Sequence, residues 1–140
     1  MIAKKIKTAV VGKNDAQNYW RRSQELFESM RNNLIVENWN AAVIDGVHAA
    51  ISANDAITVA AIGKRSTSNN HLDAAELLVQ AVPSHLKPEV SRLRRILYVK
   101  SHVEYGPSLI RVAEAEQVAK DVERFIRWAT PVFNLVKNTN

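Results

Sequence analysis

The chain has 140 residues, a length at which one domain can bury a substantial core. Its 19 lysines and arginines exceed its 14 aspartates and glutamates, which gives a formal charge of +5 and an isoelectric point near 9.7. This balance favours anionic partners such as nucleic acid. There is no cysteine, which excludes disulfides, thiolate metal sites and a cysteine nucleophile, and fits a protein of the reducing cytoplasm.

The N-terminal residues combine lysines with short apolar stretches that are too interrupted for a secretory signal. We expect a loosely ordered basic arm here. The alternation of Ile6, Thr8 and Val10 with their neighbours leaves a short β-strand as the alternative. No apolar run in the chain approaches a membrane span, so we expect no membrane association. The predicted organisation is a basic arm, a single helical domain and a polar tail: 1–13, 14–136 and 137–140.

Helical periodicity dominates the chain after the arm. A first helix is expected to begin at Asn14 or Asp15, since either side chain can cap free N–H groups. The second helix, 41–62, carries a broad stripe of small and apolar residues, which places it at the centre of a helical bundle. Asn38 or Asn40 can cap its start, and Gly63 suits the left-handed position after its end.

The second half of the chain continues the helical pattern. The residues 63–70 are polar and predict a basic loop. Pro83, Pro88, Pro107 and Pro131 are the expected boundaries of the later helices, with Pro131 ending or kinking the last one. The fold class predicted is therefore all-α, an up-and-down bundle of about five helices. Its third, fourth and fifth helices are expected at about 72–82, 88–106 and 112–130.

Arg95 and His102 are the leading candidates for catalysis. If 91–106 is one helix, a separation of seven residues places the two side chains within roughly 20° of each other and about 10 Å apart along the axis. Metal-independent RNA cleavage needs a base for the 2′-hydroxyl and a cation on the phosphate, roles that suit histidine and arginine. The competing interpretation is a surface arginine and a histidine that interacts with the helix C-terminus.

Neighbouring residues on the same helix extend this hypothesis to RNA binding. Arg92 and Lys100 would add to the positive field, and Tyr105 or Tyr98 would donate a hydrogen bond or stack on a base. No Gly-rich phosphate loop, nucleophile elbow, zinc motif or EF-hand is present, so no metal or cofactor is predicted.

Other polar residues give weaker hypotheses. Asp45 and His48 lie one helical turn apart and are predicted to be a hydrogen-bonded pair in the core, with a shared metal as the alternative. A small-molecule site around Asp45, His48 and Asn54 is a third possibility for function. We interpret His71 and His85 as surface residues. The tryptophans are expected to anchor the core or a dimer contact: Trp20, Trp39 and Trp128.

The order of several short motifs resembles the HEPN family of helical bundles, over about 16–133. The second helix opens with Asn40-Ala41-Ala42, and a basic loop leads into His71-Leu72-Asp73-Ala74-Ala75-Glu76-Leu77-Leu78. The fourth helix ends in Val103-Glu104-Tyr105-Gly106-Pro107, similar to the family's Ala-Asp-Tyr-Gly ending. A final amphipathic helix, 112–128, closes the bundle.

The resemblance implies a homodimer in which the fourth helices of two copies face each other. Many HEPN proteins are metal-independent endoribonucleases that carry an arginine followed, after four to six residues, by a histidine. Arg95 and His102 match the upper limit of that spacing. The implied function is RNA binding, with His102 as general base and Arg95 as phosphate clamp.

Two departures from the family pattern keep a second function open. Ile96 follows the arginine where the nuclease motif usually has a polar residue. Lys100 occupies the place at which one branch of the family has its arginine. The alternative function is therefore a non-catalytic dimerisation or interaction module, for instance a partner of a nucleotidyltransferase.

Overall fold

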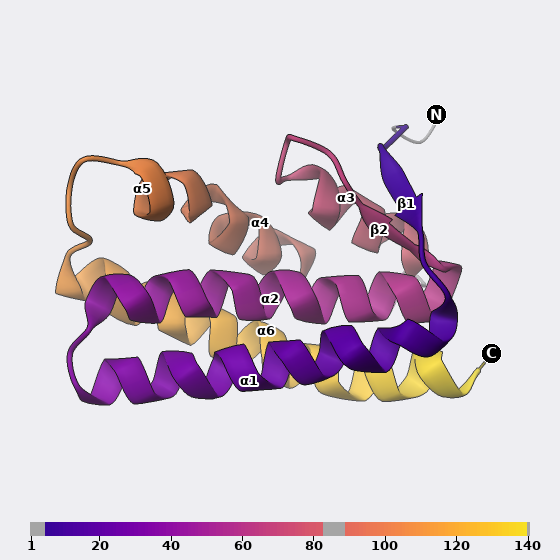
Figure 1. Cartoon of the computed structure of the whole chain (residues 1–140), viewed down its shortest axis with the longest axis horizontal. Coiled ribbons are helices and arrows are strands. Elements are labelled where there is room, and N and C mark those ends of the chain that lie inside the picture. Colours follow the sequence, from indigo (N-terminus) through magenta and orange to yellow (C-terminus); the bar gives the residue numbers. More distant parts are fainter. Residues whose placement is uncertain (1–4, 83–88, 140) are drawn as a thin grey trace.

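The computed structural model describes residues 5–82 and 89–139; the sequence predictions for Pro83, His85 and Pro88 lie outside these residues. Long helices α1, α2 and α6 pack side by side, and α3, α4 and α5 lie on the other side of α2 (Figure 1). The predicted helical bundle is therefore confirmed, with a small sheet added to it. The elements are β1 (Thr8–Val10), the 3₁₀ turn η1 (Lys13–Asp15), α1 (Ala16–Ile35), α2 (Trp39–Ile62), β2 (Lys64–Ser66), α3 (Asp73–Ala81), α4 (Val90–Tyr98), α5 (Lys100–Tyr105) and α6 (Val112–Asn138).

The sheet corrects two expectations, the loosely ordered arm and the basic loop. β1 and β2 pair antiparallel, with Thr8 opposite Ser66 and Val10 opposite Lys64. The Thr67 amide also donates to the Lys7 carbonyl at 3.0 Å. The alternating pattern of the arm was thus a strand signal, and the loop residues supply its missing hydrogen-bond partners. This pairing holds the N-terminal segment beside the start of the segment that leads to α3.

Helix α2 is the central element of the bundle. Most of its residues are buried on all sides, and Gly63 follows it with a φ of +66°, as the sequence predicted. A Cβ added to Gly46 would lie 2.6 Å from the Met30 sulfur, so the glycine permits close packing against α1. Although α2 is apolar, no helix in the described residues meets the length and hydropathy that a membrane crossing requires.

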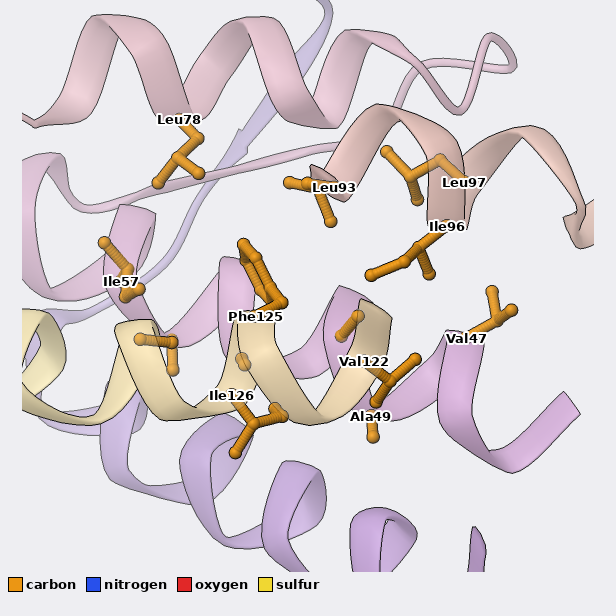
Figure 2. Packing of buried hydrophobic residues seen from close by; sticks show 14 of the residues in the cluster. Val47, Ala49, Ile57, Leu78, Leu93, Ile96, Leu97, Val122, Phe125 and Ile126 are labelled. Atoms are coloured by element: carbon orange, nitrogen blue, oxygen red, sulfur yellow. The ribbon is translucent and has the colours of Figure 1, made fainter. Parts of the chain in front are cut away.

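The core lies where α2, α4 and α6 meet, and Figure 2 shows its packing. Phe125 of α6 is fully buried beside Ile57 of α2 and Leu93 of α4 (Figure 2). The tryptophans pack against this core, as expected for anchors. Trp20 stacks on Phe133 with ring centroids 4.7 Å apart. Buried aromatic and aliphatic side chains of this kind supply most of the stabilising apolar area.

Helix α6 runs through Pro131 to Asn138, so the helix does not end at Pro131, which was one of the two outcomes predicted there. Proline removes one backbone donor, which costs stability within a helix. Beyond Pro131, however, Val132, Phe133 and Val136 are buried against the bundle. The burial of these side chains offsets the lost hydrogen bond and keeps the helix intact.

The predicted fourth helix is divided in two. α4 ends at Tyr98, and α5 begins at Lys100 after a tightened turn at Val99. The Val99 amide donates to the carbonyl of Ile96, three residues back, at 3.3 Å. A 3₁₀-type turn of this kind rotates more per residue than an α-helix. The prediction of a single uniform helical face from Arg95 to His102 is therefore wrong in detail.

Two predicted helix caps are also corrected. Asp15 and Asn38 occupy the positions before α1 and α2, but neither side chain makes a capping hydrogen bond within the described residues. Asn40 Oδ1 instead accepts from the Ile110 amide at 3.0 Å. The asparagine thus ties the start of α2 to the segment before α6.

Candidate functional site

A row of exposed polar and aromatic side chains follows the outer side of α4 and α5: Arg95, Tyr98, His102 and Tyr105. Tyr98 is 80% exposed and Tyr105 is 77% exposed, although tyrosine usually buries much of its ring. Arg95 and Tyr98 are three residues apart in α4, and His102 and Tyr105 are three apart in α5, so each pair lies on one side of its own helix. The break at Val99 shifts the two halves but leaves all four side chains open to solvent.

Arg95 and Arg92 share one carboxylate on α6. The Asp121 Oδ1 atom lies 3.2 Å from Arg92 Nη1 and 3.4 Å from Arg95 Nη2. Arg92 also binds Glu89, and its side chain is largely buried. The Arg95 side chain remains 56% exposed, so part of its guanidinium fork is available to a ligand. Arg92 therefore faces inward, while Arg95 faces outward.

Lys100 likewise lies on the inner side, in an ion-pair cluster that joins α5 to α2. Glu104 lies 3.2 Å from Lys100 Nζ and 2.6 Å from His48 Nε2. Burial alone would raise the pKa of Glu104, but the hydrogen bonds with His48 and Lys100 outweigh it and lower the pKa below its ordinary value. This cluster fixes α5 on the bundle and so positions the exposed row.

Arg95 and His102 are not joined by a hydrogen bond or ion pair within the described residues. His102 lies in the last turn of α5, where its backbone carbonyl accepts from the Gly106 amide at 3.0 Å. The two side chains share the outer surface without forming a closed site inside one copy of the chain. Among residues 5–82 and 89–139, no group of three His, Asp or Glu side chains could hold a metal ion.

A second site lies on the other side of α4 and α5, where a cleft of about 450 Å³ opens against α2. His48, Ile51 and Asp55 form its α2 wall, at spacings that place them on one helical face. Arg65 faces Asp55, with Nε 3.6 Å from Oδ2. Burial raises the pKa of Asp55 to about 6, and the attraction of Arg65 only partly opposes this effect.

The opposite wall of the cleft is the segment between β2 and α3. Ser68 organises it, because its hydroxyl donates to Asp73 at 2.6 Å and accepts from the Asn70 amide at 3.1 Å. His71 lines the cleft with partial exposure, in place of the open surface position expected for it. Three residues with hydroxyl groups line this wall: Ser66, Thr67 and Ser68. Lys100 lines the cleft from α5.

The predicted Asp45–His48 pair does not form. Asp45 accepts hydrogen bonds from Ser29 Oγ at 2.5 Å and Asn33 Nδ2 at 2.9 Å, both on α1, whereas His48 binds Glu104. Asn54 is buried and donates to the Ala74 carbonyl at 3.0 Å. Of the three residues proposed for a small-molecule site, only His48 lines the cleft.

Asp55, Arg65 and Glu104 are the site residues that sequence reasoning missed. Asp55 had a visible signal, since a carboxylate within an otherwise small and apolar helix needs a cationic partner. Its spacing of seven from His48 also places both residues on one helical face. The identity of the partner was not visible, because Arg65 reaches Asp55 through the pairing of β1 with β2.

The comparisons with known proteins assign no function to these sites. No protein-family model matches the sequence, and no curated protein matches it.

Proposed function

We propose that the protein is a HEPN-like RNA-binding protein that uses the exposed row of α4 and α5. The single observation that carries the proposal is the high exposure of Tyr98 and Tyr105 on the two short helices that also expose Arg95 and His102. Aromatic rings stack on unpaired bases, and a guanidinium fork matches phosphate oxygens. The net charge of +5 adds long-range attraction for RNA.

The proposed arrangement is a homodimer in which the rows of two copies face each other. Leu109 is 82% exposed, and Val112 is also exposed, in the segment that follows Tyr105 in the chain. Exposed apolar surface of this kind is typical of protein contacts. Facing rows would bring Arg95 of one copy together with His102 of the other. Within a single copy these two side chains do not form a closed site.

In this proposal the dimer cleaves RNA without a metal. Neutral His102 removes the proton of the 2′-hydroxyl, which then attacks the adjacent phosphorus and expels the 5′-oxygen of the next nucleotide. Arg95 neutralises the charge that develops on the phosphate oxygens. The products are a 2′,3′-cyclic phosphate and a 5′-hydroxyl, whose oxygen takes its proton from water, while protonated His102 returns its proton to solvent. Arg92 holds Asp121 beside Arg95 and acts only as a positioning residue.

The decisive experiment is RNA cleavage in excess EDTA by purified protein, with cyclic-phosphate ends as the readout. We expect cleavage by the wild type and its loss in His102→Ala and Arg95→Ala. Arg127→Ala removes an exposed arginine of α6 that pairs with Glu123 at 2.8 Å, and it serves as the matched control. Unchanged cleavage by His102→Ala would show that another residue, or a contaminant, is responsible.

The second candidate function is a non-catalytic module that contacts a nucleotidyltransferase. The ion pair that ties Arg95 to Asp121 and the break at Val99 both favour this function, because they restrain the proposed clamp. Intact RNA from a folded dimer, together with tight binding to a nucleotidyltransferase encoded beside it, would support the module over the nuclease.

A further inference from the structure

The cleft between α2, α5 and the β2–α3 segment lies apart from the exposed row and has its own chemistry. Its volume of about 450 Å³ falls in the range of small-ligand pockets, roughly 300–1,000 Å³. Side chains from three separate parts of the chain converge on it. Such convergence is the arrangement that fixes the orientation of a bound molecule.

Cationic and hydrogen-bond-donating groups dominate the polar lining. Arg65 Nε is buried and makes no hydrogen bond within the described residues, and its 3.6 Å separation from Asp55 exceeds hydrogen-bond length. The Lys100 side chain is only 12% exposed, and an ammonium has three donors, whereas Glu104 accepts one of them. His48 and His71 add two imidazoles to the lining.

Asp55 is the one carboxylate among these lining residues. Its burial disfavours the charged form, which is why its pKa rises to about 6. An anionic ligand would therefore compete for Arg65 with a carboxylate that is poorly solvated. Glu104 also pairs with Lys100, so the cleft holds two cationic side chains against two carboxylates when Asp55 is ionised. Protonation of Asp55 leaves an excess of positive charge, and an anion that takes the place of the Asp55 charge beside Arg65 restores the balance.

The positions of the cationic side chains around the cleft favour a phosphate over a carboxylate. Arg65, Lys100 and His48 line the cleft from β2, α5 and α2, so they bound it from different directions. Lys100 and His48 each also contact Glu104. The three terminal oxygens of a phosphate accept such divergent donors, whereas the two oxygens of a carboxylate lie in one plane. The cleft also has an apolar part, made of Ile51, Ala74 and Leu97.

We propose that this cleft binds a small organic phosphate monoester, with its phosphate on Arg65 and Lys100 and its organic group against Ile51, Ala74 and Leu97. The Ser66 and Thr67 segment closes one side, and the hydrogen bonds of Ser68 hold that segment in place before the ligand arrives. Binding here requires neither His102 nor a second copy of the chain, so it is independent of RNA cleavage.

Phenyl phosphate is a suitable probe, because it combines a phosphate monoester with a small apolar ring. We expect a titration followed by ¹H–¹⁵N NMR to give saturable shifts at the amides of His48, Lys100 and 65–68. Phenol should give no saturable shifts at these amides, and benzoate should bind more weakly than phenyl phosphate. Equal binding of phenol or benzoate would overturn the assignment to a phosphate.

Variants locate the site. Arg65→Gln should lower the affinity for phenyl phosphate about tenfold or more, as expected for the loss of a charged hydrogen-bond donor. Arg127→Gln, the control, and His102→Ala should retain the wild-type affinity. If Arg65→Gln does not fold, Lys100→Gln makes the same test on the opposite side of the cleft. Unchanged affinity in a folded variant of either residue, or no saturable shift in the wild type, would overturn the proposal.

Discussion

Helix α2 and the α4–α5 pair differ in how much of their surface is buried, although both pack on the same core. α2 is enclosed by α1, α3 and α6, and most of its side chains are small, apolar and buried. α4 buries one face, while the other carries Arg95 and Tyr98 into solvent. Packing therefore determines the residues of α2, whereas it leaves the outer residues of α4 and α5 free to serve binding. Substitutions in the two regions should separate stability from function.

The largest loss of stability is expected from Ile57→Ala in α2. Ile57 is fully buried, so its truncation should lower the free energy of unfolding by about 2–5 kcal/mol. Urea denaturation followed by circular dichroism measures the change. Ile35→Ala is the matched control, because Ile35 is 79% exposed at the end of α1, and its effect should be within about 0.5 kcal/mol. Similar losses from both substitutions would show that burial does not account for the difference between these positions.

Asp55→Asn should change stability in the other direction. The pKa of Asp55 rises from 3.8 to about 6 on folding, so the folded state binds more protons than the unfolded state between these values. The contribution of Asp55 to the free energy of unfolding of the wild type therefore falls as the pH rises from about 4 to 6. It stays at its low value above pH 6. At pH 7 we expect Asp55→Asn to be more stable by roughly 2–3 kcal/mol, since one pKa unit corresponds to about 1.4 kcal/mol.

Urea denaturation at pH 7 and pH 4 tests this sign. The advantage of Asp55→Asn should shrink at pH 4, where the wild-type carboxyl is protonated in the folded state. Asp15→Asn makes the same change in charge at an exposed position before α1 and serves as the control. A less stable Asp55→Asn at pH 7 would show that the attraction of Arg65 outweighs the cost of burial.

Glu104→Gln tests whether the ion-pair cluster holds α5 on the bundle. The variant loses the charge that binds His48 and Lys100, and we expect a loss of about 1–2 kcal/mol near neutral pH. Because folding lowers the pKa of Glu104, its contribution is present above the ordinary value of 4.5 and is lost as pH falls below it. Amide hydrogen exchange in α5 should be faster in the variant.

An exposed pair provides the comparison for this cluster. Glu114→Gln removes a partner of Arg111 at the start of α6, where both side chains are well solvated. Its effect should be near zero, as for most surface ion pairs. Unchanged exchange in α5 of Glu104→Gln would mean that apolar contacts alone hold the helix.

Sequence reasoning succeeded where a pattern is local and continuous. The small and apolar residues of α2 predicted its central position, and Gly63 predicted its end. A strand in the N-terminal arm was predicted only as an alternative, and its pairing with 64–66 was not predicted, because hydrogen bonds between such distant residues leave no local signature. The turn at Val99 was not predicted either, since no glycine or proline marks it.

The two candidate sites also differ in whether their residues are close together or distant in the sequence. The sequence grouped Arg95 and His102 with two further cations and with the tyrosines of the same segment. The structure leaves Arg95, Tyr98, His102 and Tyr105 exposed, whereas Arg92 and Lys100 face ion-pair partners on the inner side. The cleft combines Asp55, Arg65 and Lys100 from segments that are distant in sequence. Only the tertiary arrangement brings such residues together, so sequence reasoning did not predict the cleft.

The smallest effect on stability is expected from Tyr98→Ala and Tyr105→Ala. Both rings are almost fully exposed, so each substitution should change the free energy of unfolding by less than about 0.5 kcal/mol. A protein that leaves two tyrosines in solvent gains little from them in folding. Their loss should instead weaken binding to a short single-stranded RNA by about 1–3 kcal/mol for each stacked base, measured by fluorescence anisotropy.

Leu135→Ala removes an exposed apolar residue from α6 and is the control for nonspecific effects of surface truncation. Sedimentation of the same variants separates the two uses of the row. Weaker RNA binding with unchanged assembly would identify the tyrosines as base-stacking groups. Dissociation of the proposed dimer would instead place them in the contact between copies, and the loss of RNA binding would then follow from the loss of the proposed composite site. Unchanged RNA binding and unchanged assembly would contradict the assignment of function to this surface.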